Sequence, residues 1–472
     1  MFRRAKSIIK QPIFKTIIKL AFPIILANLF QSMYQLTDSF WVGRLGGTAL
    51  AAVSICSPII FLTIALGVGF AVAGSTFVAQ YFGAKNSKMV SHSAAQTIIM
   101  IGFVSLILSL LGYIFAPNIL KFMGATPDFF PQALSFLRIS FIAVIANFFF
   151  FVFQSIMRGI GRPQIPVYIV VITVILNFFL DPLFIFGFKF IPSFGPTGAA
   201  FATLLTQTIA AAIGFIILFD GKHYIHLKVE DFKPDFKFIK KVFLIGFPSS
   251  IDQSARSLTM VFITSLITGF GTTAIASYGA GSNLNQIAMF FGIGLAVANG
   301  TLVGQNIGAK NILQAIKISK ISAFLSFCTL SFIGALAFIF SKSFISFFVP
   351  SDIAVINEGS NFVKIVSLAF GFIGLQMSFG NVLIAAGKST TSMLVTIFSQ
   401  WLVLLPLSYF LSQHTALGLT GIWVSFPITN LITAATVFTV YHRGSWQKSR
   451  IIEEDKNITQ VSEETIVEEG IH

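Results

Sequence analysis

Apolar segments of roughly 20 residues follow one another along almost the whole of this 472-residue chain. Each is long enough to cross a hydrocarbon core of about 30 Å, and about twelve of them nearly use up the length. Only 10% of the residues are charged, too few to cover the surface of a water-soluble protein of this size. The sequence therefore predicts an all-α membrane protein with twelve transmembrane helices and excludes a disordered chain, a coiled coil or an ordinary soluble enzyme.

The apolar segments fall into two sets of six, separated by a hydrophilic stretch. We expect helices near 14–42, 49–80, 92–116, 132–156, 164–187, 196–219, 241–268, 273–305, 318–340, 357–384, 391–411 and 417–441. The predicted units are an N-terminal lobe over 1–219, a cytoplasmic linker over 220–241 and a C-terminal lobe over 242–441. Residues 442–472 are rich in glutamate and are expected to be a disordered cytoplasmic tail.

The basic residues report the orientation in the membrane. With twelve crossings, 24 of the 31 Lys and Arg lie in the N-terminal segment, the even-numbered connections and the tail, whereas 4 lie in the odd-numbered connections. The positive-inside rule then places both termini in the cytoplasm, and a bacterial inner membrane is the expected location. No basic run is interleaved with exposed aromatics, so the net charge of +14 does not predict a nucleic-acid partner.

An internal repeat divides the chain. Residues 67–86 read GVGFAVAGSTFVAQYFGAKN and residues 292–311 read GIGLAVANGTLVGQNIGAKN, with twelve of the twenty positions identical at an offset of 225. Six is an even number, so both copies enter the membrane from the same face and are related by a pseudo-twofold axis along the membrane normal. Two such lobes leave a central cleft that can open to either side in turn, which predicts alternating access by a monomer. A duplicated structural or channel scaffold is the alternative.

The motifs resemble those of multidrug and toxic compound extrusion (MATE) transporters. The resemblance rests on FPIILANLFQSMYQLTDSFWVGRLG, the pair VAQYFGAKN and VGQNIGAKN, MRGIGRP and NFFLDPLFIFG, and it covers residues 12–441. It implies two six-helix lobes that form a V. It also implies export of amphipathic, often cationic drugs and toxic compounds, driven by inward movement of protons or sodium ions.

Two carboxylates stand out because a charge inside the bilayer costs about 2.5 to 3.5 kcal/mol or more. Asp38 lies 19 residues beyond Lys19 and Asp181 lies 18 residues beyond Pro163, so both reach a similar depth, roughly 27 to 28 Å along their helices. Asn177 lies one turn before Asp181 on the same helical face. The spacing predicts a shared site for a proton or a hard monovalent cation.

The resemblance is closest to the DinF-like branch of the family, in which the positions matching Asp38, Asn177 and Asp181 bind the coupling ion. A structural role for the two acids, as a helix-end residue near Arg44 and as a cap at a break beside Pro182, is the alternative. The repeat favours a coupling site. Its second copy has isoleucine and leucine at the two acidic positions, and a role in the scaffold is expected to be duplicated.

Roles are also expected for a proline and four polar or charged residues within the predicted helices. Pro23 is expected to bend the first helix when the coupling site changes its occupancy, although its repeat at Pro248 leaves a purely structural kink open. Gln154 and Thr203 are predicted to line the cavity. Asp252, with Arg256 four residues later, is favoured as an intrahelical ion pair over a role in the second lobe's cavity.

Rival functions find little support in the motifs. The zinc, phosphate-binding and intramembrane-protease motifs of enzymes are absent, so we expect no enzyme, no metal site and no cofactor apart from H⁺ or Na⁺ as the coupling ion. The closer alternative is a flippase for lipid-linked saccharides or lipids with a related two-lobe bundle. Its cavity should carry several cations for a diphosphate, whereas Arg138, Arg256 and Lys364 are scattered over three helices.

Overall fold

The computed structural model describes residues 13–190, 192–350 and 352–452, and nearly all of their regular structure is helical. The first half contains α2 (Ile13–Gly43), α3 (Gly47–Gly83), α4 (Ser87–Phe122), α5 (Phe130–Gly159), α6 (Gln164–Phe186) and α7 (Pro196–Phe219). The 3₁₀ turn η1 (Val229–Phe232) lies in the linker. The second half contains α8 (Phe236–Thr268), α9 (Thr272–Gly308), α10 (Ile312–Ile339), α11 (Ser341–Phe348), α12 (Ile353–Ser367), α13 (Phe370–Ala385), α14 (Ser389–Ile397), the π-helical η2 (Phe398–Leu404), α15 (Leu405–Gln413) and α16 (Leu419–His442).

The helices account for the twelve predicted crossings. Ten helical stretches of the described chain are long and apolar enough to span a membrane, with Ser389–Gln413 counted as one. The pair α12 and α13, bent by 47° at its break, forms the eleventh. We assign α8 as the twelfth because it has 33 residues, although its charged side chains lower its hydropathy. The structure thus confirms the predicted all-α membrane fold.

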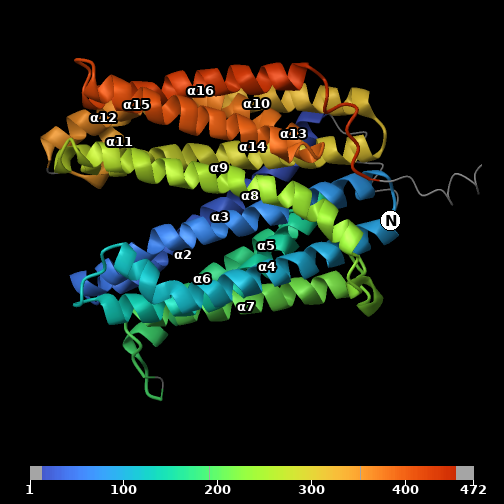
Figure 1. The fold of residues 1–472 in the computed structure, drawn as a ribbon, viewed down its shortest axis with the longest axis horizontal. Coiled ribbons are helices and arrows are strands. Elements are labelled where there is room, and N and C mark those ends of the chain that lie inside the picture. Colours follow the sequence, from blue (N-terminus) through green and yellow to red (C-terminus); the bar gives the residue numbers. More distant parts are fainter. Residues whose placement is uncertain (1–12, 191, 351, 453–472) are drawn as a thin grey trace, which may run out of the picture.

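The two halves of the chain form two bundles that lie close together at one end and diverge toward the other (Figure 1). The first helix of each repeat contacts both bundles: α2 packs on α6 and on α9, and α8 packs on α14 and on α3. The C-terminal ends of α3 and α9 meet where the bundles converge. We call this end of the molecule the closed end.

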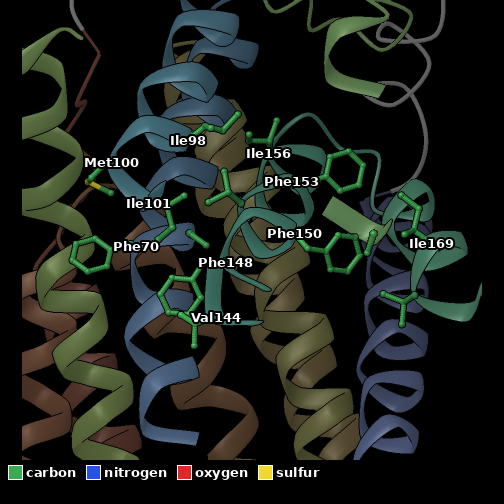
Figure 2. Packing of buried hydrophobic residues seen from close by; sticks show 14 of the residues in the cluster. Phe70, Ile98, Met100, Ile101, Val144, Phe148, Phe150, Phe153, Ile156 and Ile169 are labelled. Carbon is green, nitrogen blue, oxygen red and sulfur yellow. The ribbon is translucent and has the colours of Figure 1, made fainter. Parts of the chain in front are cut away.

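Side chains of the first half interlock between neighbouring helices. Ile98 and Ile101 of α4 gather with Phe148 and Ile156 of α5 (Figure 2), and all four are buried. In a bilayer the tails of lipids are as apolar as these side chains, so close packing rather than exclusion of water holds the helices together. Such packing makes each half a rigid frame for the polar residues described below.

The closed end is a two-fold symmetric contact between the halves. A Cβ atom at Gly83 would lie 1.8 Å from the Gln305 carbonyl oxygen, and one at Gly308 would lie 1.9 Å from that of Gln80. The glutamine side chains cross in the same way: Gln80 Nε2 donates to the Ala385 carbonyl and Gln305 Nε2 to the Gly159 carbonyl, each at 2.8 Å. These contacts relate the two copies of the repeat, and they require glycine at the points of closest approach.

The linker is shorter than predicted. The α8 helix begins at Phe236, where Asp235 caps it by accepting a hydrogen bond from the Phe238 N–H at 3.1 Å. That bond holds the pKa of Asp235 below its ordinary value. Residues 236–241, placed in the linker 220–241 by their lysines, are therefore the first turns of a helix.

The beginning of the C-terminal tail is ordered, contrary to prediction. Trp446 is fully buried, and Ser449 Oγ donates to the Ala386 carbonyl at 2.8 Å. The Ile451 N–H donates to Gln80 Oε1 at 3.2 Å, so this segment crosses from the second half to the first. Buried apolar side chains at Trp446 and Ile452 explain the order. Residues 453–472 lie outside the described part of the chain.

Because its side chain would overlap backbone atoms of the other half, Gly83→Ala should open the closed end. Overpacking of this kind costs about 1 to 3 kcal/mol, which lowers the closed population roughly tenfold. Spin labels on cysteines introduced by Lys88→Cys and Leu313→Cys, at two exposed positions, should show a longer distance between the labels in electron paramagnetic resonance spectroscopy. Gly308→Ala should act alike. Gly279→Ala is the control, because a Cβ atom there meets nothing within 4 Å. Unchanged distances in both variants would show that the contact does not control closure.

Candidate functional site

Three helices of the first half bring together a set of polar side chains that we call the acidic cluster. Its members are spaced four residues apart on each helix: Tyr34 and Asp38 on α2, Asn177 and Asp181 on α6, and Thr203 and Gln207 on α7. Residues four apart lie on one face of a helix, so each helix presents both of its polar groups to the other two. The structure therefore places Asp38, Asn177 and Asp181 together, in line with the shared site expected from the sequence.

Contacts within the acidic cluster are dense but incomplete. Asn177 Nδ2 donates to Asp181 Oδ1 at 3.1 Å, and Asp38 interacts with Asp181, Asn177 and Thr203. The hydroxyl groups of Tyr34 and Thr206 share a hydrogen bond. Four buried oxygens have no hydrogen-bond partner among the described residues: Asp38 Oδ1, Asn177 Oδ1, Asp181 Oδ2 and Gln207 Oε1.

The unpartnered oxygens define what the cluster can bind. Buried acceptors without donors are costly, and two nearby carboxylates repel each other in a poorly solvated site. A cation relieves both costs at once, either as a proton on one carboxylate or as a hard metal ion coordinated by several oxygens. Carboxylate and amide oxygens suit a proton and a sodium ion equally, so the geometry does not distinguish the two.

The second half has apolar residues at the two positions that match the acids. Ile263, which replaces Asp38 in the repeat, is fully buried, and Leu405, which replaces Asp181, lies where η2 passes into α15. The wider π-helical turn ends directly before Pro406, whose ring removes a backbone donor. The duplicated scaffold therefore carries the acidic cluster in one half of the molecule.

A cavity of about 390 Å³, which we call the central cavity, lies between the two halves. Residues of α2, α3 and α5 line it from the first half, and residues of α8, α9, α13, α14 and α16 from the second. Gln154 lines this central cavity, as predicted for it. Thr203 does not; the structure places it at the acidic cluster instead.

Two residues of α8, Asp252 and Arg256, form an ion pair in the wall of the central cavity. Arg256 Nε donates to Asp252 Oδ1 at 2.9 Å, and Arg256 Nη2 donates to Thr396 Oγ1 at 2.7 Å. Ser392 Oγ donates to the other carboxylate oxygen of Asp252 at 3.0 Å. The intrahelical pair expected from the four-residue spacing is thus present, and α14 completes its hydrogen bonding.

Pro23 lies buried within α2, which continues through it without a break. Close to this point α9 approaches α2: a Cβ atom at Gly294 would lie 2.3 Å from Ile25 Cγ1 and 3.2 Å from the Ala21 carbonyl oxygen. The stretch of α2 around the proline therefore contacts the second half, whereas Asp38, 15 residues later, contacts the first. The proline thus lies within the region of α2 that packs on the second half, and the acidic residue lies about four turns further along the same helix.

Sequence reasoning missed several members of these sites. Arg158 was counted among the cations at a helix end, yet it lines the central cavity and donates to Gln154 Oε1 at 2.7 Å. Tyr34 and Gln207 were not singled out at all. A usable signal existed, because Tyr34, Asn177 and Thr203 each precede another polar residue by four positions within a membrane-spanning helix.

A duplicated bundle of twelve membrane helices, with a polar cavity between its halves, defines an architecture of two-lobed membrane transporters. The MatE family model matches residues 23–183 and 248–410, one range in each half. The chain therefore belongs to the MatE family, which confirms the resemblance drawn from its motifs and agrees with the predicted absence of enzymatic activity. The assignment to the DinF-like branch stays a prediction.

Named relatives cover nearly the whole chain. A probable multidrug resistance protein of Bacillus subtilis, YoeA, is 26% identical over 91% of this chain and 93% of its own length. A probable multidrug resistance protein of Thermotoga maritima, NorM, is 25% identical over 94% and 95%. Among solved structures, an outward-facing MATE multidrug resistance transporter aligns with a TM-score of 0.87 and 23% identity, over 94% of this chain and 98% of that one. This likeness supports the two-lobed fold.

If the acidic cluster binds a cation, the cation should stabilise the folded protein. Binding to the folded state alone contributes about 2.7 kcal/mol at a hundredfold excess over the dissociation constant. We expect the Tm of the purified protein to rise with sodium or with falling pH, and the rise to disappear in Asp38→Asn combined with Asp181→Asn. Asp128→Asn, in an exposed turn, should retain it. An equal rise in the double variant would place the ion elsewhere.

Proposed function

We propose that this protein is an antiporter that exports amphipathic small molecules in exchange for an inward-moving proton or sodium ion. The observation that supports this proposal is the acidic cluster, in which four buried oxygens have no hydrogen-bond partner among the described residues. Family membership and the names of the relatives, which describe multidrug resistance proteins, support the export of small molecules.

The fold suggests how the two sites communicate. The α2 helix carries Tyr34 and Asp38 to the acidic cluster and, nearer its start, packs on α9 of the other half. A cation at Asp38 and Asp181 reduces their repulsion and draws α2 toward α6. Because Pro23 weakens α2 where the helix packs on α9, a change at Asp38 alters the bend of the helix and the width of the central cavity.

We further propose that the closed end faces the cytoplasm of a bacterial inner membrane, with both termini on that side. The lysine-rich N-terminal segment and linker then lie inside, as the positive-inside rule requires. The structure corresponds on this assignment to an outward-facing state. One chain supplies both lobes, so a monomer is sufficient for alternating access.

The charges of the cavity favour a small amphiphile over a lipid-linked saccharide. Among the described lining residues, Arg158 and Arg256 are the cations, and Asp252 neutralises Arg256. A diphosphate headgroup carries more negative charge than the remaining guanidinium balances. A flippase therefore remains the alternative but fits the cavity less well.

Coupling through the acidic cluster predicts a loss of transport in Asp38→Asn and in Asp181→Asn. In everted vesicles, uptake of norfloxacin, a zwitterionic fluorescent drug, should fall at least roughly tenfold in each variant, because neither can release the coupling ion. Separate proton and sodium gradients identify the ion. Glu230→Gln, in the linker, should transport at the parental rate. Parental rates in both aspartate variants under either gradient would refute the assignment.

The bend at Pro23 predicts a difference between the two repeated prolines. Pro23→Ala restores a backbone donor and should reduce norfloxacin uptake severalfold, with an unchanged elution volume and Tm. Pro248→Ala is the matched control, because α8 ends in a half without the acidic cluster, and it should transport nearly as the parent does. An equal loss in the two variants would mean that both prolines serve only the shape of the helices.

A further inference from the structure

The central cavity has an unusual balance of charge for a protein expected to export organic cations. Of its described lining residues, three are charged: Arg158 of α5, and Asp252 and Arg256 of α8. Their formal sum is one positive charge. In a cavity between apolar helices, screening is weaker than in water, so a single charge has a strong influence on which ligands enter.

The carboxylate in this cavity is not available to a cationic ligand. Asp252 Oδ1 accepts from Arg256 Nε and Asp252 Oδ2 accepts from Ser392 Oγ, so both oxygens are engaged. Displacing these partners would leave the guanidinium of Arg256 beside the incoming cation, which adds repulsion to the loss of an ion pair. An organic cation therefore finds no free carboxylate in the described cavity wall.

The cation on the opposite wall is available to an anion. Arg158 donates to Gln154 Oε1, a neutral acceptor, and this is the one side-chain hydrogen bond recorded for it among the described residues. A guanidinium has five donors in a planar fork that matches a carboxylate or a sulfonate. A second donor in the same cavity, Asn28 Nδ2, is buried and has no hydrogen-bond partner in the described part of the chain.

Apolar side chains complete the site. The same cavity is also lined by Val68 and Val72 of α3, Phe151 of α5, and Met289 and Ile293 of α9. A volume of about 390 Å³ suits a ligand of the size of a small drug. The combination of apolar walls with a donor-rich, positively charged position is complementary to an amphiphile that has one acidic headgroup.

We propose that the central cavity selects amphipathic molecules with a single negatively charged head, such as a carboxylate or sulfonate, with Arg158 as the specificity-determining residue. This inference rests on the proposed export function and narrows its substrate class. It departs from the organic cations that the family resemblance implies. The acidic cluster keeps its separate role as the site of the coupling ion.

Equilibrium binding tests the selection without any ion gradient, so its outcome is independent of coupling. Two probes share one fluorophore and differ in the sign of their charge: dansylglycine, an anion, and dansylethylenediamine, a cation. The purified full-length protein should bind dansylglycine at least roughly tenfold more tightly, the effect of one charge-assisted hydrogen bond. Equal or tighter binding of the cation would overturn the proposal.

Variants of Arg158 and Arg256 test which residue causes the preference for the anionic probe. Arg158→Gln should lose roughly tenfold in affinity for dansylglycine and little for the cation, whereas Arg158→Lys should retain most of the preference. Arg256→Gln exposes the carboxylate of Asp252 and should strengthen binding of the cation. Asp38→Asn should keep the parental preference even where it abolishes coupled transport. A parallel loss of both probes in Arg158→Gln, without rescue by lysine, would reduce Arg158 to a structural role.

Discussion

The cost of placing carboxylates inside a membrane governs the organisation of this protein. Asp38 and Asp181 lie on two helices that are apolar enough to span a membrane, and each carboxylate would be expelled or neutralised if it stood alone. Their mutual contact and the neighbouring amides and hydroxyls keep them in place, yet four oxygens stay unpartnered among the described residues. A site that holds its carboxylates in place but leaves some of their oxygens without hydrogen bonds is suited to reversible binding of an ion.

The duplicated fold separates the acidic cluster from the contacts between the halves that form the closed end. Reciprocal contacts of Gly83 with Gln305 and of Gly308 with Gln80 hold the closed end with two-fold symmetry, so each copy of the repeat contributes equally. The two carboxylates of the acidic cluster and the guanidinium of Arg158 break that symmetry, because Ile263, Leu405 and Ile384 stand at the matching positions of the second half. Both copies of the repeat thus form the closed end, whereas the acidic cluster and Arg158 belong to the first half.

Much of this organisation follows from local patterns in the sequence. Apolar length predicts the twelve helices, the offset of 225 predicts the two lobes, and matched helical depth brings Asp38 close to Asp181. Contacts between distant helices were less accessible. The sequence around Gly83 does not show its close contact with Gln305 of the opposite half, and the sequence around Arg158 does not show that this side chain lines the central cavity. The buried Trp446 likewise reveals its order only through the helices it contacts.

The central claim is that Asp38 and Asp181 change their protonation or ion occupancy as the transporter works. Infrared difference spectroscopy of the purified protein, between acidic and alkaline pH and with or without sodium, observes the carboxyl groups directly. The account predicts a carboxylic acid band that disappears on deprotonation or on sodium binding, and that is absent from Asp38→Asn combined with Asp181→Asn. A spectrum identical in the parent and the double variant would contradict it.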